Sequence, residues 1–175
     1  MKTILLLMAI VPAIAISAPK DTYSNFSYHG VEVGFSPGDD RPIYQVNAQS
    51  PWHQNGFAFA SVDTDLHGDT QSELALGFMA PASDFVDIVG SLGAHLNVVG
   101  DTDVGVIARL GARYWLTPQV ELAASAGVVD EAEKARFIGR FGAQYHLSHA
   151  ISLGGKIEGK SGASTNFYLN TAFSF

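Results

Sequence analysis

The chain has 175 residues, and its 17 Asp and Glu against 10 Lys and Arg give a formal net charge of −7. This acidic balance excludes nucleic acid as an expected partner, because nucleic-acid binding requires a basic face. The absence of Cys excludes disulfide bonds and cysteine-ligated zinc sites. The length fits a single domain.

The first 18 residues have the pattern of a secretory signal peptide. Lys2 precedes an apolar run from Ile4 to Ile10, and small residues near Ala18 offer cleavage sites. The apolar run is shorter than the ~20 residues that a membrane-spanning helix needs. We therefore predict export of the protein, with residues 1–18 as the signal peptide and residues 19–175 as one β-barrel domain.

The rest of the chain alternates between apolar and polar residues with the period of a β-strand, interrupted by Gly, Asp, Pro and Asn. A polar stretch at 129–136 is predicted to be mainly a loop, and the pattern slips near Gly30, where a bulge is expected. Eight strands remain an alternative to ten. The ten predicted strands span residues 26–35, 42–50, 56–65, 71–80, 86–98, 104–116, 119–129, 135–147, 150–160 and 165–175.

The last six predicted strands each have one face without charge and one face that carries charges. The charged face is padded with Gly, Ser, Ala and Asn, which favours a lumen over a face in water. In the strand at 56–65 the phase is open, since either Phe57 and Phe59 or Ala58, Ala60 and Val62 could form the apolar face. We predict a closed, antiparallel, up-and-down transmembrane β-barrel, because lipid does not tolerate open sheet edges.

Aromatic residues gather near the ends of the predicted strands, as in barrels whose aromatic girdles meet both membrane interfaces. One group is expected at the rim that holds the chain ends, and a second group at the opposite rim. The first group is Trp52, Phe57, Phe78, Phe85, Tyr114, Trp115, Tyr145, Phe173 and Phe175, and the second is Phe35, Tyr44, Phe137 and Phe167.

The last residues, Phe167-x-Leu169-x-Thr171-x-Phe173-x-Phe175, resemble the C-terminal signal that the outer-membrane barrel-assembly machinery reads. The segment from Tyr28 to Phe35 resembles the first strand of some small ten-stranded barrels. With the signal peptide, these features resemble small bacterial outer-membrane β-barrel proteins of the OmpA/OmpX or small-porin type. The resemblance implies a monomer in the outer membrane of a Gram-negative cell. It also implies contact with lipid and lipopolysaccharide, and assembly with the help of periplasmic chaperones.

The charged face predicts a network of ionic side chains inside the barrel. Such a network either tunes a passive pore or fills the barrel as structural ion pairs, because unpaired charges in a narrow lumen are costly. We expect a structural envelope protein or a minor passive pore, with no catalysis, cofactor or metal ion. The predicted network is Glu32, Glu73, Asp87, Arg109, Arg113, Glu121, Arg140, Lys156 and Glu158.

Two alternatives belong to other classes. The order His146, Ser148, Glu158 resembles the triad of outer-membrane lipid A deacylases, with Ser148 as nucleophile, His146 as base and Glu158 orienting the base. The spacing argues against it, since Glu158 is expected near the far end of its strand. A soluble periplasmic β-barrel that binds a small ligand is the other alternative, with the apolar face turned inward.

Overall fold

The computed structural model describes residues 24–38, 41–99, 101–131 and 134–175. The predicted signal peptide lies outside these residues. The described residues form ten β-strands, as predicted, and the eight-stranded alternative is wrong. The strands are β1 (Gly30–Ser36), β2 (Ile43–His53), β3 (Gly56–Thr64), β4 (Thr70–Ser83), β5 (Val86–Val99), β6 (Asp101–Thr117), β7 (Val120–Glu131), β8 (Lys134–His146), β9 (Ile151–Lys160) and β10 (Asn166–Ser174).

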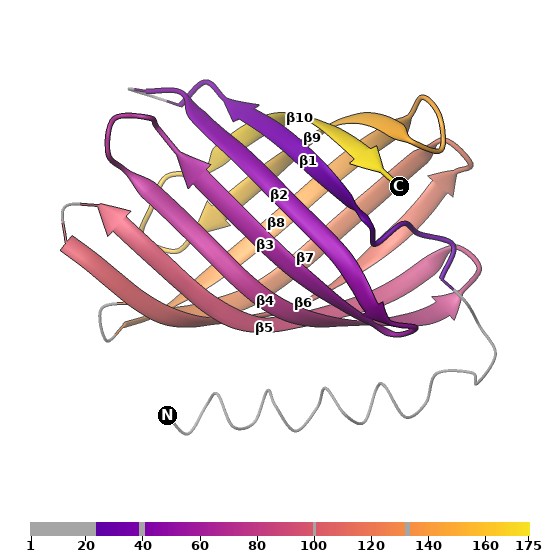
Figure 1. Cartoon of the computed structure of the whole chain (residues 1–175), viewed down its shortest axis with the longest axis horizontal. Helices are drawn as coiled ribbons and strands as arrows, with labels where there is room; N and C mark the ends of the chain where they lie inside the picture. Colours follow the sequence, from indigo (N-terminus) through magenta and orange to yellow (C-terminus); the bar gives the residue numbers. More distant parts are fainter. Residues whose placement is uncertain (1–23, 39–40, 100, 132–133) are drawn as a thin grey trace.

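Each strand pairs antiparallel with its neighbour in the chain, and β1 also pairs with β10, so the sheet closes into a barrel (Figure 1). At this closing seam the register runs from Gly30 opposite Ser174 to Phe35 opposite Leu169. Closure leaves no strand with an unpaired edge. The prediction of a closed, all-β, up-and-down barrel is therefore confirmed.

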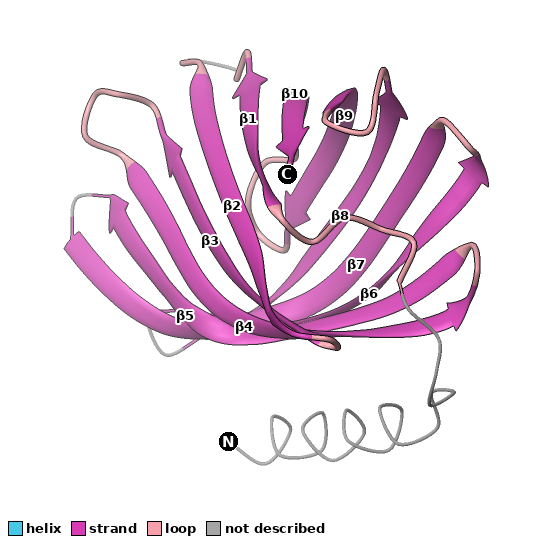
Figure 2. Ribbon diagram, turned by 45° about the vertical axis from the view of Figure 1, so that its right-hand side comes forward, coloured by secondary structure: helices cyan, strands magenta, loops and turns pink. Residues whose placement is uncertain are grey.

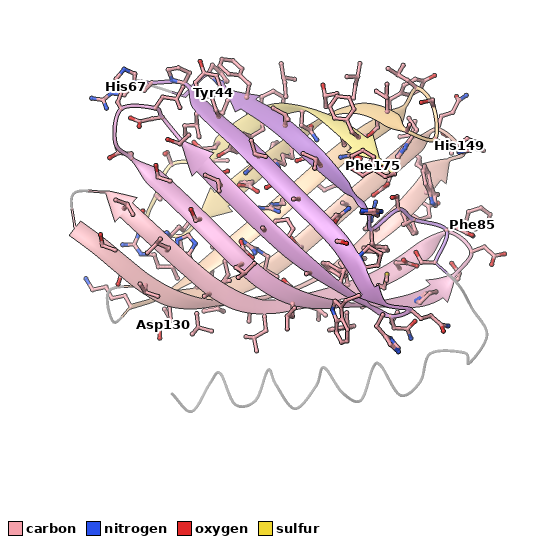
Figure 3. All side chains as sticks on the ribbon, viewed as in Figure 1. Tyr44, His67, Phe85, Asp130, His149 and Phe175 are labelled. Atoms are coloured by element: carbon pink, nitrogen blue, oxygen red, sulfur yellow. The ribbon has the colours of Figure 1, made fainter. Side chains whose placement is uncertain are left out.

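The barrel has two chemically different rims. The terminal rim carries the short turns at 54–55, 84–85, 118–119 and 147–150 together with Phe175, and the loop rim carries the other five connections. Figure 3 shows Phe85, His149 and Phe175 at the terminal rim and His67 and Asp130 at the opposite one. An even number of strands places both ends of the barrel domain at the same rim.

Two predicted boundaries differ from the structure. The first strand begins at Gly30 instead of residue 26, and residues 24–29 lead into it as non-strand backbone, as Figure 2 shows. The stretch 129–136, predicted to be a loop, is mostly strand, since β7 and β8 stay paired out to Glu131 opposite Lys134. Polar side chains at a rim do not prevent backbone pairing, so polarity alone was a poor guide to the strand ends.

Apolar side chains cover the outside of the barrel, and polar side chains fill the inside. Leu74, Leu153 and Phe137 are 67%, 46% and 74% exposed, whereas Gln45 and Glu73, which face inward, are buried. This is the inverse of a water-soluble barrel and fits a surface that meets lipid. Among the described residues, no helix is long and apolar enough to cross a membrane.

The phase of β3 is settled by Phe57, which points into the barrel and is only 8% exposed. It lies over Gly77 of β4, where an added Cβ atom would come within 2.3 Å of the Phe57 ring. Trp115 is also turned inward and packs against the same buried cluster. Placing Phe57 and Trp115 in the outer aromatic girdle was therefore wrong. Other aromatics predicted for the girdles, among them Trp52, Phe85, Phe137 and Phe175, are exposed.

Candidate functional site: the barrel lumen

The lumen contains two chambers in sequence. The inner chamber, toward the terminal rim, has a volume of about 260 Å³ and is lined by Glu32, Arg113 and Lys156 among others. The outer chamber, toward the loop rim, has a volume of about 760 Å³. Arg109, Ser125 and Arg140 line both chambers, so the two spaces meet at these side chains.

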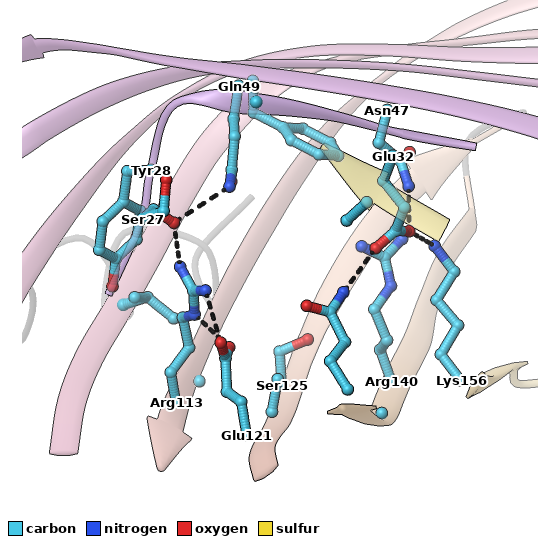
Figure 4. Close-up of a pocket in the computed structure, with 18 of the residues that line it drawn as sticks. Ser27, Tyr28, Glu32, Asn47, Gln49, Arg113, Glu121, Ser125, Arg140 and Lys156 are labelled. Atoms are coloured by element: carbon cyan, nitrogen blue, oxygen red, sulfur yellow. Dashed lines mark hydrogen bonds and ion pairs between the residues drawn. The ribbon is translucent and has the colours of Figure 1, made fainter. Parts of the chain in front are cut away.

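The carboxylate of Glu32 is the centre of the inner chamber's hydrogen bonds (Figure 4). Its Oε1 accepts from Lys156 Nζ at 2.6 Å and from Asn47 at 2.8 Å. Its Oε2 accepts from Asn170 at 2.7 Å and from Gln144 at 2.9 Å. Donors from β2, β8, β9 and β10 therefore converge on one side chain of β1, which ties the closing seam together across the lumen.

Arg113 of β6 occupies the terminal-rim end of the inner chamber. Its Nε and Nη2 donate to Glu121 of β7 at 2.6 and 3.0 Å, a two-bond pairing with fixed geometry. Glu121 is also 3.3 Å from Nε2 of His146. Arg113 Nη1 donates to the backbone carbonyl of Ser27 at 2.8 Å, which links the strand wall to the segment before β1.

Two further ion pairs cross the region where the chambers meet. Arg109 pairs with Glu73, and Arg140 pairs with Glu158. Asp63, farther along the outer chamber, has a buried Oδ1 with no hydrogen-bond partner among the described residues. Pairing of most charges makes a low-dielectric lumen tolerable, because an isolated charge there would cost several kcal/mol.

Residues 24–29 fold back into the terminal-rim opening of the barrel and form what we call the N-terminal segment. Phe26 stacks on Trp115 with ring centroids 5.3 Å apart, and Tyr28 lies against Phe57 at 5.2 Å. The guanidinium carbon of Arg113 lies 4.9 Å from the Phe26 ring centroid and 4.7 Å from that of Tyr28. An apolar cluster thereby fills the opening beneath the polar lumen.

Asp87 of β5 fastens the same segment by hydrogen bonds. The Tyr28 hydroxyl donates to Asp87 Oδ2 at 2.8 Å, and the Ser24 hydroxyl donates to the same oxygen. Burial in the opening raises the pKa of the Tyr28 phenol far above its usual range, so Tyr28 is a permanent donor at physiological pH. Asp87 itself is only 1% exposed.

The structure brings the nine predicted lumen residues into the barrel interior, eight of them as four ion pairs. The pairs are Glu32 with Lys156, Glu73 with Arg109, Glu121 with Arg113 and Glu158 with Arg140. Asp87 differs, since hydroxyls of the N-terminal segment bind it. The sequence placed Asn170 on the lumen face but did not identify Asn47, Gln144 and Asn170 as partners of Glu32, and it did not predict the contacts of Phe26 and Tyr28. In the sequence, the break in alternation near Gly30 was the one indication that residues 24–29 do not continue the first strand.

The deacylase-like triad is not assembled. Opposite His146 in the β8–β9 register is Ser152, whereas Glu158 is opposite Arg140, six residues away along the strand. Ser148 Oγ accepts from the backbone N–H groups of Ala150 and Ile151, as a turn-capping hydroxyl does. Among the described residues, no group of three or more His, Cys, Asp and Glu side chains could hold a metal ion.

The final residue adds a last contact to the seam beyond β10. The backbone N–H of Phe175 donates to the carbonyl of His29 at 3.1 Å, and the two rings meet edge to face at 5.5 Å. The side chains of Phe167, Leu169, Phe173 and Phe175 all point outward and are exposed.

Three solved structures are similar in fold. A KdgM porin has a TM-score of 0.55 at 6% sequence identity, covering 83% of this chain and 99% of that chain. A NanC porin has a TM-score of 0.59 at 12% identity, covering 83% of this chain and 98% of that chain. A KdgM porin in complex with disordered oligogalacturonate has a TM-score of 0.54 at 6% identity, covering 83% and 99%. No family model and no curated protein matches the chain. At these identities, the likeness shows that the barrel has the fold of these small porins.

Proposed function

We propose that this protein is an outer-membrane barrel that acts as a narrow passive pore for small polar solutes. The observation that carries the proposal is the pair of polar chambers that meet at Arg109, Ser125 and Arg140, within a barrel that shares its fold with porins. A barrel built only for structural support would have its lumen filled by side chains. Here the outer chamber alone has room for many water molecules.

The solute class is set by the small bore and its charges. Side chains of ion pairs reach across the lumen at Glu32 and at Arg109, which favours ions and small neutral solutes over chain-like sugars. One similar porin is described with oligogalacturonate, an acidic sugar. The outer chamber of this protein carries acidic and basic side chains in nearly equal number, and Glu73 and Glu158 are paired with Arg109 and Arg140, so its charge does not favour an acidic sugar.

Planar-bilayer recording of the purified, folded barrel tests the pore. We expect small, ohmic conductance steps that fall when Ser125 is replaced by Phe at the junction of the chambers. A Ser50→Phe control, on the exposed outer face near the terminal rim, should conduct like the wild type. Absence of conductance steps from well-folded protein would overturn the proposal in favour of a purely structural barrel.

The membrane location has its own test at Leu153, an outward residue in the first half of β9. A Leu153→Arg substitution should lower the unfolding free energy by roughly 1–2 kcal/mol if this face meets lipid, less than at a bilayer midplane because Leu153 lies opposite Tyr145 toward the terminal rim. The control Leu147→Arg, in an exposed turn at the terminal rim, should cost roughly 0–1 kcal/mol. Urea unfolding in lipid vesicles measures both, and equal costs would contradict a lipid-facing surface at Leu153.

A further inference from the structure

We propose that the N-terminal segment, residues 24–29, is a built-in plug that narrows the terminal-rim opening of the lumen and so limits its conductance. The proposal rests on the proposed pore only in its effect on conductance, since the segment's position in the opening is independent of any transport. It gives the segment a role that neither the fold of the similar porins nor the predicted first strand implies.

The position of the segment is the first step. A chain that only led into β1 would cross the rim and remain in contact with water. Instead Phe26 and Tyr28 are 6% and 5% exposed, and they form one buried cluster with Phe57 and Met79 from β3 and β4. Trp115 of β6 closes the cluster from another wall. The segment therefore packs against three strands of the barrel wall, β3, β4 and β6.

The interactions that hold the segment are the second step. Asp87 accepts the hydroxyls of Ser24 and Tyr28, while Asn25 donates to the carbonyl of Asp84 at 2.9 Å. The carbonyl of Ser27 accepts from Arg113 at 2.8 Å and from Gln49 at 3.4 Å. These bonds come from β2, β5, β6 and the turn at 84–85, so the segment is anchored at several points along one side of the opening.

The anchors of the segment on Asp87 and Arg113 are side chains, so its removal would leave the strand pairing of the barrel unchanged. Here the buried carboxylate of Asp87 and the guanidinium of Arg113 are the main polar partners, and both are groups that water solvates well once the segment leaves. Arg113 keeps its two bonds to Glu121 in either case, so the wall of the barrel stays intact without the segment.

The plug can be tested through Trp115, whose ring Phe26 covers. In a Trp52→Phe background, Trp115 is the only tryptophan of the chain. The release variant Ser24→Ala with Tyr28→Phe removes both hydroxyl bonds to Asp87 but keeps the rings of Phe26 and residue 28, so increased exposure of Trp115 reports movement of the segment. The matched control is Ser50→Ala with Tyr145→Phe, a Ser and a Tyr that are exposed at the same rim.

Acrylamide quenching of Trp115 and planar-bilayer conductance are measured on the same folded samples. We expect quenching and conductance to rise severalfold in the release variant and to stay at the wild-type level in the control. Tyr28→Phe, which keeps the ring and removes one hydrogen bond, should show a smaller rise and serves if the double variant does not fold.

Each outcome decides one claim. Quenching in the release variant equal to that of the control would overturn the plug. Increased quenching with unchanged conductance would also overturn it, because the segment would cover the opening without limiting passage. If no variant conducts, the proposed pore fails, and the quenching result alone then decides whether residues 24–29 cover the opening.

Discussion

At the scale of single residues, Gly77 leaves the space in the barrel interior that the ring of Phe57 occupies. Glycine is required there because any side chain would meet the Phe57 ring on the neighbouring strand. Relief of that contact would push Phe57 toward the N-terminal segment, since Phe57 also packs on Tyr28.

We predict that Gly77→Val lowers the unfolding free energy by roughly 1–3 kcal/mol through overpacking. The matched control is Gly139→Val on β8, where an added Cβ atom has nothing within 4 Å. Urea unfolding in lipid vesicles, followed by tryptophan fluorescence, compares the two. A Gly139 variant as unstable as the Gly77 variant would show that the Phe57 contact is not the cause.

Asp65, in the β3–β4 loop, combines several local interactions at one carboxylate. Its Oδ1 accepts from the backbone N–H groups of His67 and Asp69 at 2.8 and 3.0 Å, and its Oδ2 pairs with Arg41 at 2.9 Å. The His67 amide, followed by the Arg41 bond, outweighs partial desolvation and lowers the pKa of Asp65 from 3.8 to about 2.

This shift predicts a pH dependence whose sign is fixed. Because the folded-state pKa is the lower one, ionised Asp65 stabilises the fold above about pH 4 and loses that contribution as the pH falls through about 2. The stability difference between wild type and Asp65→Asn should therefore shrink between pH 4 and pH 2. Thermal unfolding in detergent micelles across that range measures it, and a constant difference would contradict the assignment.

At the scale of elements, the sequence predicted well which side chains of each strand face inward. It predicted poorly whether residues 24–29 form a strand. The alternation fixed which side chains face inward in β5 to β10, since each strand separates the outer surface from the lumen along its whole length. The segment before Gly30 was predicted as strand because Phe26 and Tyr28 alternate with polar residues. Alternation of apolar and polar residues does not by itself identify a strand. Residues 24–29 alternate because Phe26 and Tyr28 both pack into a buried cluster.

The aromatic residues near the terminal rim also show that position along a strand does not reveal whether a ring faces outward. Phe57 and Trp115 occur at the strand positions expected of a girdle, yet both face inward. For Phe57 only its contact with Gly77 reveals this, whereas Trp115 lies between the outward residues Tyr114 and Leu116, so the phase of β6 already turned it inward. The ion pairs were easier to anticipate as a group than as individual pairs, because the group follows from the phase of the strands and the pairs follow from their register.

The last strand, β10, carries a prediction about assembly. Its outward residues end in exposed Phe175, in the pattern expected of an assembly signal. Phe175→Asp should reduce the amount of folded, heat-modifiable protein in the outer membrane severalfold, while the stability of barrel refolded in vitro changes little. Phe85→Asp, the same exchange at an exposed position of the same rim, is the control. Equal loss of assembly in both variants would argue against a signal.

At the scale of the whole molecule, the chambers, the ion pairs and the N-terminal segment follow one another along the lumen. This order determines what a solute meets, more than any single ion pair does. From the loop rim inward, solvent reaches the outer chamber, the ion pairs at Arg109 and Arg140, the Glu32 centre and then the N-terminal segment. The Arg109–Glu73 pair and the Glu32 centre join strands that are not neighbours in the sheet, whereas Arg140 and Glu158 lie on the paired strands β8 and β9. Side chains in the lumen thereby link the strands of the barrel, and open space remains between these links.

The Glu32 centre also constrains the order of folding. Its donors Gln144, Lys156 and Asn170 are 112, 124 and 138 residues away in the sequence, so these bonds form only when the first strand meets the last ones. The bond between Glu121 and Arg113 spans only 8 residues and needs one hairpin. We therefore expect ring closure to be a late event in folding, stabilised by the bonds of the Glu32 carboxylate.

This difference predicts opposite kinetic effects of one chemical change. Glu32→Gln should destabilise the barrel by roughly 1–3 kcal/mol, mainly through faster unfolding, because its bonds are absent from the transition state. Glu121→Gln should instead slow folding, since its hairpin forms early. Folding and unfolding rates in lipid vesicles at several urea concentrations measure both. The single carboxylate of β1 would then act as a kinetic latch, which sets how long the closed barrel persists and not how fast it forms.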